Sequence, residues 1–135
     1  MAKESGLGWS TCSLDDASGT PQDIKNDITN LEISTPRAVQ DVTGLDKSAV
    51  ERILLLADCS GTLNGVFNDA ANKGHAVLKT VSSTSVNRTL TLTVSGQTLA
   101  NEVLVTDYPL TRAASGELTY AAPFVLADGN VPTWS

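Results

Sequence analysis

The sequence of 135 residues is 41% hydrophobic, 18% charged and 4% aromatic, which predicts a single domain over residues 1–135 with a mainly aliphatic core. Its formal net charge of -6 disfavours binding to nucleic acid or to an anionic membrane, because like charges repel. The few aromatic residues disfavour sites that stack bases or sugars, and no apolar run approaches the roughly 20 residues of a transmembrane helix.

Residues 8–36 predict short extended segments joined by turns. A strand over residues 8–16 is expected to end at the turn-forming run 15–19. Farther on, Ile24 and Ile28 are spaced as on one face of a helix, whereas Leu31 and Ile33 alternate with polar residues as on a half-buried strand. Pro36 is expected to end that strand.

The next segment is polar at first and then apolar. Residues 37–47 are polar and contain Gly44, which predicts an exposed loop long enough to carry a function or an interface. In residues 48–57 the apolar positions 50, 53, 54 and 57 have helical spacing and favour a short helix. The apolar run 53–56 could equally begin a buried strand.

The middle of the chain predicts a strand followed by a helix. Residues 59–67 alternate as a strand, and Gly61 and Gly65 within it indicate close approach of another backbone or a β-bulge. Residues 68–80 are the best helix candidate, because Asn68 or Asp69 can cap its N-terminus and several helix-favouring residues follow.

The C-terminal half is strongly β in character. In residues 88–95, leucine and valine alternate with threonine and serine, and Gly96 and Gln97 separate this strand from another over residues 98–107. A further strand is expected over residues 116–124. An extended tail with Trp134 then follows a turn at Asp128 and Gly129.

Candidate catalytic and metal-binding residues are few and isolated. His75 is the only histidine, and no second ligand stands at metal-binding spacing beside it. The adjacent Asp15 and Asp16 are better explained by a turn than by an acid–base pair. No nucleophile with an activating base and no phosphate-binding loop is present in the sequence. We therefore expect no enzymatic activity, no cofactor and no metal.

The two cysteines are expected to be structural. The N-terminal residues lack the apolar stretch of a signal peptide, so we expect synthesis in the cytosol, where disulfides are rare. Cys12 and Cys59 form no CxxC or Cys/His pattern. They are therefore expected to pack as small hydrophobic residues.

The polar faces of the predicted strands are rich in threonine, serine and asparagine but poor in lysine. Exposed strand edges are usually protected by lysine or proline. Unprotected edges indicate that the strands are paired, with another copy of the chain as one candidate partner. The alternative is an ordinary β-sandwich with a polar outer face.

The order of several segments resembles a known family. The N-terminal strand is followed by DIKNDITNLEIST, by the exposed DVTGLD loop, and by LADCSGTLNGVFND with a short helix after it. Three C-terminal strands and a tail with DG and a tryptophan complete the series. Over nearly its whole length the chain resembles the major tail proteins, or tail tube proteins, of long-tailed bacteriophages.

This resemblance implies a mainly β fold, a β-sandwich or small barrel with one flanking short helix. It also implies a non-enzymatic subunit that forms hexameric rings stacked into a tube, located in the virion tail after assembly in the host cytoplasm. DNA would pass through the lumen without specific binding. Tape measure, tail terminator and baseplate proteins would be its partners besides further copies of itself, and no membrane would be involved. The alternative is a capsid decoration protein or another β-sandwich assembly module of a virion.

Two sets of residues follow from this interpretation. By strand alternation, the candidate lumen residues on polar faces are Glu32, Thr91, Thr93 and Glu102, although these faces could instead point outside the tube. Contacts between subunits or rings are expected from extended arms at residues 1–9 and 128–135 and from the loop at 37–47. The candidate contact residues are Val39, Gln40, Asp41, Val42, Thr43, Gly44, Leu45, Asp46, Lys47 and Trp134.

Overall fold

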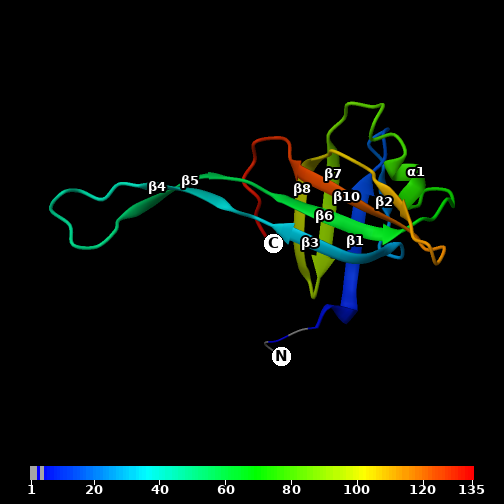
Figure 1. Ribbon diagram of the computed structural model, residues 1–135, viewed down its shortest axis with the longest axis horizontal. Helices are drawn as coiled ribbons and strands as arrows, with labels where there is room; N and C mark the ends of the chain where they lie inside the picture. The colour runs from blue at the N-terminus through cyan, green and yellow to red at the C-terminus, as the bar shows by residue number, and fades with distance from the viewer. Residues whose placement is uncertain (1–2, 4) are drawn as a thin grey trace.

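The computed structural model describes residue 3 and residues 5–135, and the described chain is mainly β with one short α-helix (Figure 1). A 3-10 turn, Gly6–Gly8, leads into the first strand, and the helix α1 is Gly74–Leu78. The strands are β1 Trp9–Asp15, β2 Pro21–Asp23, β3 Ile28–Ser34, β4 Arg37–Asp41, β5 Arg52–Ala57, β6 Ser60–Val66, β7 Arg88–Val94, β8 Gln97–Val105, β9 Leu110–Arg112 and β10 Leu118–Leu126.

Most of the strands belong to one curled sheet. Its order is β2-β1-β7-β8-β10-β6-β3, with β9 paired to β10. All of its pairings are antiparallel. Figure 1 shows β3, β6 and β10 running across β1, β7 and β8, so the sheet folds over and encloses its own inner face. This confirms the predicted mainly β fold of the sandwich or barrel type, with one short helix beside it.

The core is built by alternation on the strands. Because successive side chains point to opposite faces, every second residue of the longer strands in the main sheet reaches the inside. On β7, Leu90 and Leu92 are buried, and on β10 Tyr120, Ala122 and Phe124 are buried. The other buried apolar residues are Cys12, Leu14, Ile24, Cys59, Leu63, Val77, Leu78, Leu99 and Val103. Both cysteines are buried and free, as the sequence predicted.

The glycines of β6 permit close packing against the neighbouring backbone. A Cβ atom on Gly61 would clash with the backbone carbonyl of Glu32, and one on Gly65 would lie 2.6 Å from the carbonyl oxygen of Asp27. Strand β3 also has a register shift between Ile28 and Asn30 where it pairs with β6. The close approach predicted from these glycines is confirmed.

The helix is shorter than predicted. Only Gly74–Leu78 of the expected helix 68–80 is α-helical, and Asn72 has a positive φ of 62°. The buried Asp27 holds this region, since its carboxylate accepts hydrogen bonds from Asn68 Nδ2 at 2.7 Å and from the Gly74 backbone N–H at 2.9 Å. These long-range contacts favour a loop where the local sequence favours a helix.

Of the two alternatives for residues 48–57, the helix is wrong and the strand is confirmed, although this strand is exposed where a buried one was expected. Residues Arg52–Ala57 form strand β5, which pairs with β4, Arg37–Asp41. The expected loop at 37–47 is therefore a strand over its first part and a turn only beyond Asp41. Strands β4 and β5 together form a two-stranded sheet that is separate from the main one.

Candidate assembly interface

Strands β4 and β5 form a hairpin, the arm (residues 37–57), that extends away from the domain (Figure 1). The arm continues the β3–β6 pair, because β3 leads into β4 through Pro36, and β5 leads into β6 through Asp58. The Asp58 backbone N–H donates to the Pro36 carbonyl at 2.9 Å and connects the two pairs. The main sheet thus fixes where the arm begins, while the rest of the arm lies outside the core.

Apolar side chains are exposed on both faces of the arm. Val39 lies opposite Leu54, while the next pair, Gln40 and Ile53, points to the other face. Leu56 is 85% exposed. A register shift at this end of the arm places more residues on β5 than on β4. The other large apolar residues exposed on the arm are Val42, Leu45, Val50 and Leu55.

This pattern is unusual for a chain that stays monomeric. A two-stranded hairpin alone is at best marginally stable in water, and contiguous exposed apolar surface marks an interaction site. A strand with apolar residues on both faces is typical of burial on both faces. The arm therefore has the character of an interaction surface.

The tip of the arm is held by local hydrogen bonds. The Asp41 carboxylate accepts from the Thr43 backbone N–H at 2.9 Å and from its hydroxyl at 2.6 Å, and the Thr43 hydroxyl accepts from the Glu51 N–H at 2.8 Å. The two hydrogen bonds from Thr43, first that of its hydroxyl, lower the pKa of Asp41. Lys47 lies 4.0 Å from Asp46 in an exposed ion pair. Polar contacts hold the turn, while its apolar side chains remain exposed.

The predicted contact residues lie in two separate places. Residues 39–47, all predicted as contacts, lie on β4 and the tip of the arm, and all are exposed. Trp134 instead bridges to Leu99, and Ser135 exchanges backbone hydrogen bonds with Thr98 at 2.7 and 2.9 Å. The end of the C-terminal segment thus lies along β8, although Trp134 is still 47% exposed. Of the expected N-terminal arm, residues 1, 2 and 4 lie outside the described residues.

All the candidate lumen residues lie on the outward side of the curled sheet, away from the core. Since β3 runs across the layer of β1, β7 and β8, the outward side chains of β3 and of β7 point to different sides of the domain. On β7 and β8, Thr91 pairs with Ala100 and Thr89 with Glu102, and all point opposite to the buried leucines. Glu32 pairs with Thr62, which pairs with Pro123 of β10, again on the side away from the core. We call this set the outer face: Thr11, Ser13, Asn30, Glu32, Ser34, Ser60, Thr62, Asn64, Thr89, Thr91, Thr93, Thr98, Ala100, Glu102, Leu104, Ala121, Pro123 and Val125.

The outer face is polar and weakly acidic. Glu32 and Glu102 are the charged residues of this set, Asp23 of β2 lies beside it opposite Ser13, and none of its members is lysine or arginine. Hydroxyl groups pair across the strands, as between Thr93 and Thr98 at 3.1 Å, and Thr89 donates a hydrogen bond to the Glu102 carboxylate. Such a surface repels a polyanion and offers it no fixed cationic partner.

The described residues contain few groups suited to chemistry. Among them, no cluster of three or more histidine, cysteine or acidic residues could hold a metal ion, and no helix is long and apolar enough to cross a bilayer. His75 packs on Phe67 at 4.7 Å between ring centroids, and its Nδ1 lies 3.1 Å from the Tyr108 hydroxyl. Burial raises the pKa of Cys12 to about 12, which keeps that thiol protonated and unreactive.

Sequence reasoning missed the apolar half of the arm. Ile53, Leu54, Leu55 and Leu56 were not predicted as contact residues, because they were assigned to a helix or to a buried strand. The signal that could have found them is the run of four consecutive apolar residues after a polar segment. Such a run on a hairpin has no core of its own chain to enter, so it stays exposed.

Comparisons with known proteins find the same fold in solved structures. No family model and no curated protein matches the sequence. A chain in the solved virion of a native gene transfer agent (GTA) particle is similar in structure, with a TM-score of 0.75 and 16% identity over 98% of this chain and 99% of that one. A chain in the tail of the empty GTA particle, refined with helical C6 symmetry, gives a TM-score of 0.73 and 20% identity over the same shares. The chain therefore shares its full-length fold with these chains.

Proposed function

We propose that this protein is a structural, non-enzymatic subunit of a virion tail, which assembles into six-membered rings that stack into a tube. The observation that carries the proposal is the full-length likeness to a chain in a tail with C6 symmetry. Fold alone does not define function, so the surface of this chain must also suit assembly. The exposed apolar residues of the arm meet this second requirement.

The arm suits contacts between subunits. It exposes apolar residues on both faces and reaches beyond the domain, so a neighbouring copy could cover it without any change in the core. Burying such side chains contributes about 25 cal/mol per Å² of apolar surface, and the gain is repeated in every subunit of a ring. Assembly would thus stabilise a hairpin that has little support in a single subunit.

The outer face suits the wall of a channel. Because the sheet closes over its core, Glu32 on β3 points to a different side of the domain from the polar residues of β7 and β8. In the proposed tube, one of these two groups lines the lumen, either Glu32 or the set Thr91, Thr93 and Glu102, and DNA passes along it without specific binding. A basic wall would retain phosphate groups, whereas hydroxyl groups and a few carboxylates do not. Tail terminator, tape measure and baseplate proteins would complete the structure at its ends and inside its lumen, and assembly would take place in the host cytoplasm.

Negative-stain electron microscopy of the purified chain tests this proposal. We expect rings or hollow tubes of uniform diameter, at high protein concentration if not at low concentration. Six-fold averages of end-on views would support the ring. Compact monomers under every concentration and salt condition would contradict the proposal, and binding only to the outside of preassembled capsids would favour a decoration protein instead.

A further inference from the structure

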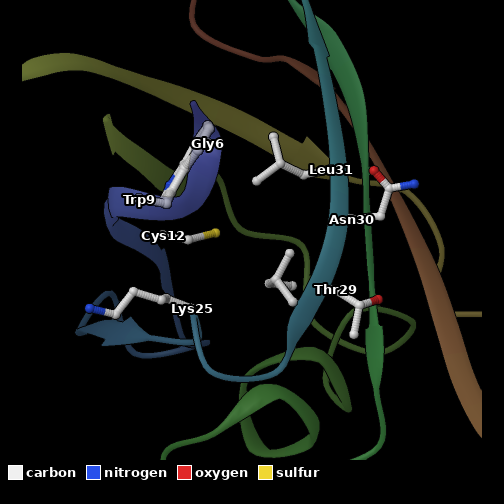
Figure 2. A pocket seen from close by; sticks show the side chains of 8 residues that line it. Gly6, Trp9, Cys12, Lys25, Thr29, Asn30 and Leu31 are labelled. Atoms are coloured by element: carbon white, nitrogen blue, oxygen red, sulfur yellow. The ribbon is translucent and has the colours of Figure 1, made fainter. Parts of the chain in front are cut away.

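A groove of about 340 Å³ lies between β1 and β3, where the β2–β1 end of the curled sheet approaches its other end at β3 (Figure 2). Cys12 on β1 and Leu31 on β3 point into the space between these strands, whereas Asn30 points away from it. Trp9 and Ile28 complete its apolar part, and both are half-buried. Lys25 at its border is the one charged residue among the described residues that line it.

One side of this groove is a free strand edge. Strand β3 is the last strand of the sheet and pairs with β6 alone within the described part of the chain. The β1 side is partly occupied, because the Cys12 carbonyl accepts from the Ile24 N–H at 2.9 Å and the Ser10 carbonyl accepts from Lys25 Nζ at 3.1 Å. A free edge beside an apolar groove is suited to adding another strand.

The arm has the complementary properties. Strand β5 pairs only with β4 in the described residues, so its other edge is also free. Its Ile53 and Leu54 are exposed on opposite faces, so one of them can enter an apolar groove while the other stays available to a further neighbour. The arm of the same chain points away from the domain, which leaves a second copy as its source (Figure 1).

Charge favours the same pairing. The tip of the arm, residues 41–51, carries Asp41, Asp46 and Glu51 against the single Lys47. The border of the groove carries Lys25, which is exposed. Opposite charges at the border would orient the arm, while the apolar contacts and the backbone hydrogen bonds would supply most of the affinity.

We propose that the groove between β1 and β3 receives the arm of a second copy, with β5 added along the free edge of β3. This inference rests on the proposed function and names the surface that the arm contacts. It also explains why part of the groove is apolar although it opens at the surface. The free edge of β3 would be covered in the assembly, so it needs no lysine or proline to prevent unspecific pairing.

Site-directed cross-linking tests the contact. Lys25→Cys and Leu54→Cys are both exposed positions, so each variant is expected to fold. The two variants, mixed and assembled, are treated with a short bismaleimide and digested for mass spectrometry. We expect a cross-link between position 25 of one copy and position 54 of another. Glu32→Cys is the matched control, because it lies on β3 but points to the outer face.

The outcomes separate this inference from the proposed function. Tubes that form without the 25–54 cross-link, or that give an equal 32–54 cross-link, would overturn the groove as the docking site and leave the tube proposal standing. Equal rates of maleimide labelling at Lys25→Cys in monomers and in tubes would also overturn it, because the groove would then be empty in the assembly. Absence of tubes from the wild-type chain contradicts the proposed function itself.

Discussion

Val39 on β4 lies directly opposite Leu54 on β5, and these side chains are 52% and 61% exposed. Cross-strand apolar neighbours usually cover each other on the buried face of a sheet, but the two-stranded arm has no second layer to cover this pair. The pair therefore stabilises the hairpin only weakly in a single subunit. Its main contribution is expected when another chain covers it.

The first prediction concerns this pair. Leu54→Asp should leave the monomer folded, with a free energy of unfolding within about 0.5 kcal/mol of the wild type, because the position is exposed. The same change should raise the protein concentration needed for assembly by about tenfold or more, since a buried carboxylate without a partner costs more than 1.4 kcal/mol. Sedimentation and circular dichroism measure the two effects. Val131→Asp, at an apolar position off the arm that is 64% exposed, is the control, and equal losses in both variants would contradict a special role of the arm.

The sequence predicts those parts of the fold in which one strand face is buried. Strands β7 and β8 follow their alternation, and the turn between them is Ser95 and Gly96, one residue before the expected position. Both turn residues have positive φ values, 52° and 78°, as a tight type I′ hairpin requires. Alternation fails on the arm, because Ile53 to Leu56 have no single buried face. The run of four apolar residues also supplies apolar positions at helical spacing, which is why a helix was predicted.

The remaining errors come from contacts between residues far apart in the sequence. The region predicted as a helix over residues 68–80 is mostly a loop, because Asn68 and Gly74 bind the carboxylate of Asp27, 41 and 47 residues away. Nothing local at Asp27 indicates that it is 1% exposed. The candidate lumen residues were placed on polar faces by alternation alone. That they lie on the outward side of the curled sheet depends on the strand order, which the sequence does not contain.

The second prediction concerns Arg88, which is 2% exposed. Its guanidinium donates to the carbonyls of Asp15 at 3.0 Å and Val77 at 2.8 Å, and to the Thr80 hydroxyl at 2.9 Å. Arg88→Ala should lower the free energy of unfolding by about 3 kcal/mol, because it leaves buried acceptors unpaired and opens a cavity. Urea unfolding measures the loss. Arg52→Ala on the exposed arm should change stability by at most about 0.5 kcal/mol, and a similar loss there would contradict the explanation.

The third prediction concerns the stability of the fold in alkaline solution. Burial, and to a smaller extent the charge of Asp23, raises the pKa of Cys12 from 9.0 to about 12. The folded state therefore keeps this proton while the unfolded state loses it, so the contribution to stability is complete below pH 9 and is lost as the pH rises toward 12. Between pH 9 and 10 the Cys12→Ala variant should lose about 1 kcal/mol less stability than the wild type. Urea unfolding at each pH gives this difference, and parallel pH profiles would contradict the assignment.

The last prediction concerns the outer face as a channel wall. Glu32→Lys exchanges an exposed carboxylate for an ammonium group, and in a ring the change is repeated in every subunit at the same height. Tubes of this variant should retain DNA that was present during assembly at low salt and release it as salt rises, because phosphate contacts weaken steeply with ionic strength. Co-sedimentation of labelled DNA with tubes measures retention. Glu117→Lys makes the same charge change in an exposed turn away from the outer face and should not retain DNA. Equal retention by both variants would assign the effect to net charge, and tubes of Glu32→Lys that retain no DNA would place the β3 side of the outer face away from the lumen.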